Sequence, residues 1–153
     1  MGVEIGQEAP DFELKGHGAD KKKLSDYRGE QAVALVFYPF TFTGVCQGEL
    51  CQLRDDFSEF EQAGVQVMAI SCDTAPAQKK WAEDQGFNFP VLSDFWPHGE
   101  VAKAYGVFND AIGAASRATF LIGKDGVVVD TFESPDLGTA REKSRYQEAI
   151  AKL

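Results

Sequence analysis

The sequence has 153 residues but no long hydrophobic run, which excludes a membrane-spanning helix of the usual length. It also lacks an apolar N-terminal stretch that would predict a secretion signal, so we expect a cytoplasmic protein. The net charge is −9, and the one basic run, Lys21 to Lys23, is short and lies between turn residues. Nucleic acids and membranes are therefore poor partners for its surface.

Patterns typical of metal and cofactor sites are missing as well. His17 and His98 are the only histidines, and no glycine pattern fits a phosphate or dinucleotide site. We therefore expect neither a metal nor a cofactor. The three cysteines would lie in a reducing compartment and do not predict a disulfide framework. We interpret them as redox-active or buried thiols.

A regular alternation of strand and helix patterns is present instead. Almost continuous apolar runs predict buried strands at 32–38 and 65–72, and shorter strands are expected at 89–92, 118–122 and 127–132. Helical patterns cover 43–63, 76–85, 100–105 and 141–153, and the N-terminal part predicts a small strand pair. This order predicts an α/β fold with a mixed central sheet flanked by helices, in one domain spanning residues 1–153.

Cys46 is the residue with the most reactive predicted environment. It lies in the first turn of the helix predicted at 43–63, directly after a buried strand and Pro39. The first N–H groups of a helix have no intrahelical partner, and the helix dipole places partial positive charge there. Both effects favour the thiolate, which is the reactive form of cysteine. Thr43 adds a hydroxyl one turn before the sulfur, and Pro39 fixes the approach of the backbone.

The apolar face of the same helix predicts where the sulfur points. The residues on this face are spaced four, three, four and three positions apart: Cys46, Leu50, Leu53, Phe57 and Phe60. We therefore expect the sulfur on the core side of its helix rather than in open solvent.

The pattern Pro39-x-x-x-Thr43-x-x-Cys46 resembles the active-site motif of the peroxiredoxins. The resemblance covers nearly the whole chain. It is strongest to the AhpE type, through Phe-Thr-Gly-Val-Cys-Gln-Gly-Glu-Leu at 42–50 and Leu-Ser-Asp-Phe-Trp-Pro-His-Gly at 92–99. It implies a thioredoxin fold in its peroxiredoxin variant. It also implies that Thr43 bonds both the sulfur and the peroxide, and that the N–H groups of Val45 and Cys46 stabilise the departing oxygen.

The resemblance also suggests partners for the sulfur. Peroxiredoxins carry an arginine at the point matched by Arg117, just before strand 118–122, where it would favour the thiolate and orient the peroxide. We find no second cation candidate near Cys46; the alternative is that Arg117 is an ordinary surface residue. The family has Glu or Gln at the position of Glu49, orienting the arginine, whereas spacing alone equally predicts a solvated helix carboxylate.

Cys51 departs from the AhpE type and resembles the resolving cysteine of the bacterioferritin-comigratory (PrxQ) type, five residues after the reactive one. Five residues of intact helix separate Cα atoms by roughly 8–9 Å, whereas a disulfide tolerates at most about 7 Å. A bridge to Cys46 therefore needs the helix to unwind. The alternative is that Cys51 only packs beside Leu50 and an external thiol resolves Cys46. Cys72, at the end of strand 65–72, is interpreted as core filling.

Together these features predict a thiol-dependent peroxidase that reduces hydrogen peroxide and organic hydroperoxides through a sulfenic acid at Cys46. The expected reductant is a thioredoxin-like or mycoredoxin-like protein, or a low-molecular-weight thiol, and the resemblance implies a homodimer. Two alternatives stay open. One is a thiol–disulfide oxidoreductase on the same fold, although Cys46-Gln47-Gly48-Glu49 lacks its Cys-x-x-Cys. The other is a non-enzymatic redox sensor or holdase.

Overall fold

Strands with buried side chains on both faces form the centre of the computed structural model, which describes residues 2–18 and 20–153. Among these residues, seven strands form one sheet in the order β2-β1-β5-β4-β3-β8-β9. The strands span Glu13–Gly16 (β1), Lys21–Lys23 (β2), Ala32–Phe37 (β3), Val65–Ser71 (β4), Val91–Ser93 (β5), Ala118–Ile122 (β8) and Val128–Glu133 (β9). Pairs β3·β4 and β4·β5 are parallel, and the other pairs are antiparallel. The predicted mixed α/β sheet is therefore confirmed.

Two hydrophobic clusters cover the two faces of this sheet. Along β3 and the residue after it, Val33, Leu35 and Phe37 point into one cluster, and Ala34, Val36 and Tyr38 point into the other. This alternation follows from the two-residue repeat of a strand, and it explains why β3 reads as a continuous apolar run.

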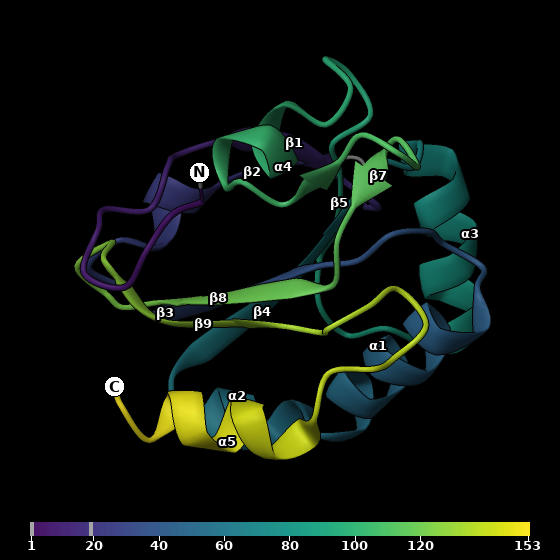
Figure 1. Ribbon diagram of the computed structural model, residues 1–153. Coiled ribbons are helices and arrows are strands. Elements are labelled where there is room, and N and C mark those ends of the chain that lie inside the picture. Colours follow the sequence, from purple (N-terminus) through teal and green to yellow (C-terminus); the bar gives the residue numbers. More distant parts are fainter. Residues whose placement is uncertain (1, 19) are drawn as a thin grey trace.

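The helices divide between the two faces (Figure 1). The face that contains Cys46 is covered by α1 (Gly44–Asp55), α2 (Phe57–Gln62), α3 (Ala75–Gln85) and α5 (Lys143–Ile150). The other face is covered by the 3₁₀ helix η1 (Leu24–Tyr27) and α4 (Glu100–Ala104). In this structure β8 lies beside β3 on the side opposite β4, as the position proposed for Arg117 requires.

The helix predicted at 43–63 is broken, so that prediction was wrong in its continuity. Asp56 leaves the helical conformation, with φ −91° and ψ 11°, and separates α1 from α2. After the break Phe60 is buried, whereas Phe57 is only half-buried. The four-three spacing of apolar residues fits a straight helix and two consecutive helices equally well, so it could not reveal the break.

The bounds of other helices and strands also differ from the predicted ones. The last helix begins at Lys143 rather than at residue 141, which leaves Arg141 in an extended segment before it. Strand β5 begins at Val91, after Pro90, because proline has no N–H to donate to a ladder. The short hairpin of β6 (Phe108–Asn109) and β7 (Ala114–Ala115) was not predicted, since two-residue strands carry no periodicity. No helix of the described residues is both long and apolar enough to span a membrane.

Candidate active site

The connection from β3 into α1 places Cys46 at the start of a helix. Thr43 is the extended residue before α1, which begins at Gly44, so Cys46 is in the first helical turn. The first intrahelical bond runs from Gln47 N–H to the Thr43 carbonyl at 2.8 Å. The N–H groups of Val45 and Cys46 therefore have no acceptor within the helix. The Cys46 side chain is 0% exposed, which confirms the predicted core-side orientation of the sulfur.

Arg117 supplies a positive charge directly to this sulfur. Its Nη1 lies 3.0 Å from Cys46 Sγ, and its Nε donates to the Leu137 carbonyl at 2.7 Å. The residue is only 5% exposed, so it is not an ordinary surface arginine. A guanidinium at this distance stabilises the thiolate electrostatically. Among the described residues none accepts a hydrogen bond from Arg117 Nη2, so this group can bind an oxygen.

Glu49 joins Arg117 to a second arginine that the sequence interpretation missed. Its Oε1 accepts from Arg117 Nη1 at 2.8 Å and from Arg141 Nη2 at 3.0 Å; its Oε2 accepts from Arg141 Nε at 3.0 Å and from Arg141 N–H at 2.7 Å. Glu49 is only 6% exposed, so it is not a solvated helix carboxylate. Burial acts to raise the pKa of Glu49, but the hydrogen bonds and charge of Arg141 outweigh burial and hold this pKa below its ordinary value.

Arg141 is therefore a second cation near Cys46, and the expectation of a single cation was wrong. Its Nη1 also donates to the Phe37 carbonyl at 2.7 Å and to Thr119 Oγ1 at 3.3 Å. Burial acts to lower the pKa of Arg141, yet the surrounding groups Tyr146, Glu49 and Cys46 raise it above its ordinary value. In sequence Arg141 is the first residue of a predicted amphipathic helix, a position that a solvated arginine takes equally well.

The loop that carries Pro39 and Thr43 is held by polar contacts from the residues that directly follow β3 and β4. Thr41 N–H donates to Asp73 Oδ2 at 2.8 Å, and Tyr38 Oη lies 3.0 Å from Thr41 Oγ1. Pro39 is buried at the end of β3, and Phe42 adopts a left-handed φ of 65°, which is rare for an aromatic residue. Such strain persists only where the surrounding structure fixes the backbone.

Thr43 is exposed, and its hydroxyl donates to the Phe40 carbonyl at 2.6 Å. Among the hydrogen bonds of the described residues, none joins Thr43 to Cys46 Sγ. The bond expected between this hydroxyl and the sulfur is therefore not formed in this structure. The hydroxyl retains its lone pairs as acceptors at the mouth of the loop.

The two remaining cysteines lie in different environments. Cys51 is half-buried in α1, and its Sγ donates to Gln85 Oε1 on α3 at 3.5 Å. Since α1 runs unbroken from Gly44 to Asp55, Cys46 and Cys51 are too far apart to bond in this conformation. Burial, followed by the charges of Asp94 and Asp73, raises the pKa of Cys72 to about 12, so Cys72 remains an unreactive thiol.

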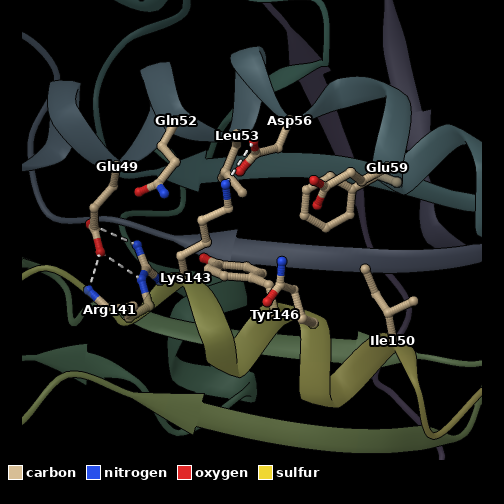
Figure 2. A pocket seen from close by; sticks show the side chains of 11 residues that line it. Glu49, Gln52, Leu53, Asp56, Glu59, Arg141, Lys143, Tyr146 and Ile150 are labelled. Atoms are coloured by element: carbon tan, nitrogen blue, oxygen red, sulfur yellow. Dashed lines mark hydrogen bonds and ion pairs between the residues drawn. The ribbon is translucent and has the colours of Figure 1, made fainter.

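A narrow cleft opens behind the Glu49–Arg141 pair, between α1 and α2 on one side and α5 on the other (Figure 2). Its interior volume is about 20 Å³, which corresponds to roughly one water molecule. Cys46 does not line it. This cleft is therefore too small for an organic substrate and does not lead to the sulfur.

Comparison with known proteins agrees with this geometry. The AhpC/TSA family model matches residues 5–131. The chain belongs to this family. It is 45% identical over 151 residues to alkyl hydroperoxide reductase E of Mycobacterium tuberculosis, covering 99% of this chain and 98% of that protein. Peroxiredoxin Bcp of Bacillus subtilis is 36% identical over 159 residues, covering 100% of this chain and 96% of that protein.

A solved structure of the same family has the same fold. The crystal structure of peroxidoxin BcpB from Mycobacterium tuberculosis superposes with a TM-score of 0.86 at 31% identity, covering 98% of this chain and 96% of that one. The resemblance to AhpE-type and Bcp-type peroxiredoxins and the thioredoxin-fold prediction are thus confirmed. As a peroxiredoxin, the chain is a thiol-dependent peroxidase and an oxidoreductase.

Proposed function

We propose that Cys46 is the residue through which this peroxiredoxin reduces hydrogen peroxide and organic hydroperoxides. The observation that carries the proposal is the 3.0 Å contact between Arg117 Nη1 and Cys46 Sγ in the first turn of α1. The thiolate attacks the distal peroxide oxygen, and the O–O bond breaks as the S–O bond forms. Cys46 becomes a sulfenic acid, and the departing oxygen takes up a proton to leave as water or an alcohol.

The surrounding groups stabilise the charge that moves during this step. The sulfur loses negative charge as the departing oxygen gains it, so donors must face both atoms. Arg117 faces the sulfur, and the N–H groups of Val45 and Cys46 supply further donors. Glu49 orients Arg117, Thr43 contacts the peroxide, and Pro39 fixes the loop that shields the reacting atoms.

Resolution of the sulfenic acid by Cys51 is the second part of the proposal. A Cys46–Cys51 bridge requires the start of α1 to unwind, and Glu49 lies within the unwound turns. The four bonds from Glu49 to the two arginines must therefore break as the bridge forms. Oxidation favours this step, because a sulfenic acid lacks the thiolate charge that Arg117 pairs with. A thioredoxin-like or mycoredoxin-like protein would then reduce the bridge.

An external small thiol is the alternative route, in which Cys51 stays in place against Gln85. Peptide mapping by mass spectrometry after one equivalent of peroxide distinguishes the two routes. A Cys46–Cys51 disulfide supports internal resolution, whereas a persistent sulfenic acid or a mixed disulfide at Cys46 supports the external route. Peroxide consumption without any modification of Cys46 would contradict the proposed function.

The proposal includes a homodimer and a cytoplasmic location. Four exposed aromatic side chains follow the carboxyl ends of the parallel strands β3 and β5, at one edge of the sheet: Phe40, Phe42, Phe95 and Trp96. Trp96 is 81% exposed. Exposed apolar patches on a protein surface often mark sites of protein–protein contact. A second copy packed there would cover them beside Cys46. The three free thiols suit a reducing compartment.

A further inference from the structure

Tyr146 connects helix α5 to the arginines that face Cys46. Its hydroxyl lies 3.0 Å from Thr119 Oγ1, and Thr119 Oγ1 accepts a hydrogen bond from Arg141 Nη1 at 3.3 Å. Arg141 is bound to Glu49, which is bound to Arg117, whose Nη1 contacts the sulfur. Figure 2 shows Tyr146 projecting from α5 on the same side as Arg141, across the cleft from α1.

The ring of Tyr146 has packing partners that are independent of its hydroxyl. It makes edge-to-face contacts with Phe60 of α2 and Phe132 of β9, at centroid distances of 6.0 Å and 4.9 Å. These contacts account for an aromatic ring at this half-buried position. A phenylalanine would satisfy them equally, so the hydroxyl needs a separate explanation.

The position of Thr119 gives that explanation. Thr119 is 1% exposed on β8, and its one hydroxyl must serve both Arg141 and Tyr146. A free hydroxyl rotates to suit its surroundings, whereas one that is bound to a phenol has a fixed orientation. Fixing it keeps a lone pair directed at Arg141. Burial also raises the pKa of Tyr146, so the phenol stays neutral and acts through its hydrogen bond rather than as a charge.

We propose that Tyr146 is a positioning residue for peroxide reduction, acting through Thr119 on Arg141 and thereby on Glu49 and Arg117. The inference rests on the proposed role of Cys46. It extends the functional unit from the start of α1 to α5, on the other side of the cleft. Movement of α5 would then change the position of the groups that face Cys46 Sγ.

The test compares Tyr146→Phe, which keeps the ring and removes the hydroxyl, with the wild type. We expect a thiolate titration of Cys46 shifted to higher pH and a peroxide rate constant lower by about two- to tenfold, the range for one lost hydrogen bond. Thr119→Val should have a similar effect, and Thr119→Ser should recover most of the lost rate. The double variant Tyr146→Phe/Thr119→Val should be no slower than Thr119→Val alone, because both act along one path.

Tyr105→Phe is the matched control. Tyr105 is a tyrosine at 1% exposure, whereas Tyr146 is half-buried; the Tyr105 hydroxyl donates to the Pro10 carbonyl at 2.7 Å, and its ring lies in the cluster on the other face of the sheet. It should lose stability without any change in titration or rate. Equal effects of the two tyrosine variants, or no effect of Tyr146→Phe, would overturn the inference. Peroxide turnover that persists in Cys46→Ser would instead overturn the proposed function itself.

Discussion

Replacing Glu49 with glutamine removes the negative charge that two buried guanidinium groups share. Glu49 accepts from Arg117 at 2.8 Å and from the Arg141 side chain at two positions of 3.0 Å each. Removing one partner of a buried ion pair typically costs about 3–5 kcal/mol of the free energy of unfolding. Because domains are stable by about 5–15 kcal/mol, Glu49→Gln should remain folded but be measurably less stable.

The same substitution changes the charge that faces Cys46. Cys46 Sγ and Glu49 Oε1 lie no more than about 5.8 Å apart, because Arg117 Nη1 is 3.0 Å from the sulfur and 2.8 Å from the oxygen. Two negative charges at that separation repel by roughly 3 kcal/mol at an effective dielectric constant of about 20. Glu49→Gln should therefore relieve this repulsion. The peroxide reaction should nevertheless slow by about tenfold or more, because Arg117 loses its orientation.

Acid denaturation gives an independent measurement on the same variant. The folded-state pKa of Glu49 lies below its ordinary value of 4.5, because the bonds and charge of Arg141 outweigh the opposing effect of burial. A lowered carboxyl pKa stabilises the fold above the unfolded pKa, and this contribution is lost as pH falls through the folded value. The wild-type free energy of unfolding should therefore decrease as pH falls below about 4.5, and less steeply in Glu49→Gln.

Urea denaturation and stopped-flow peroxide reduction measure these effects. Glu59→Gln, which changes an exposed carboxylate on α2, is the control and should resemble the wild type. A destabilisation of Glu49→Gln below about 1 kcal/mol, as for a solvated charge, together with an unchanged peroxide rate, would refute the bridging role of Glu49.

Three further predictions concern the sulfur, its resolution and the assembly. Arg117→Ala should slow peroxide reduction by about tenfold to a thousandfold in stopped-flow experiments. The control is Arg28→Ala, which replaces an exposed arginine paired with Glu8 and should leave the rate unchanged. Equal rates for the two variants would exclude Arg117 from the reaction. Cys51→Ser should keep the peroxide step within a few-fold, fail to be recycled by a thioredoxin-like protein, and overoxidise more easily. Recycling identical to the wild type would leave Cys51 a packing residue. Trp96→Glu should convert a dimer to monomers in sedimentation experiments. An unchanged mass would exclude the exposed aromatic surface of Phe40, Phe42, Phe95 and Trp96 as the interface.

The position of Cys46 was predictable because every feature that defines it is local. A buried strand, a proline and a helix start adjoin in sequence, and the helical spacing places the sulfur on the core side. The position of Arg117 near Cys46 was predicted only from the family resemblance, because β8 pairs with β3 across a long stretch of chain.

The second arginine could not be predicted for the same physical reason. Arg141 meets Glu49 across 92 positions of sequence, and nothing local separates a buried ion pair from a solvated arginine. Spacing likewise left Glu49 open between two roles that only burial decides. The break at Asp56 was invisible, because apolar periodicity records which residues face the core and not whether one helix or two present them.

The reactivity of Cys46 can be tested most directly with one substitution. Cys46→Ser removes the thiolate and keeps a side chain of nearly the same size, so the fold should persist, as circular dichroism can verify. Peroxide consumption with a recycling reductant should then fall to the rate of the uncatalysed reaction, although Cys51 and Cys72 remain. Turnover by Cys46→Ser above that background would contradict the assignment of the peroxidase reaction to Cys46.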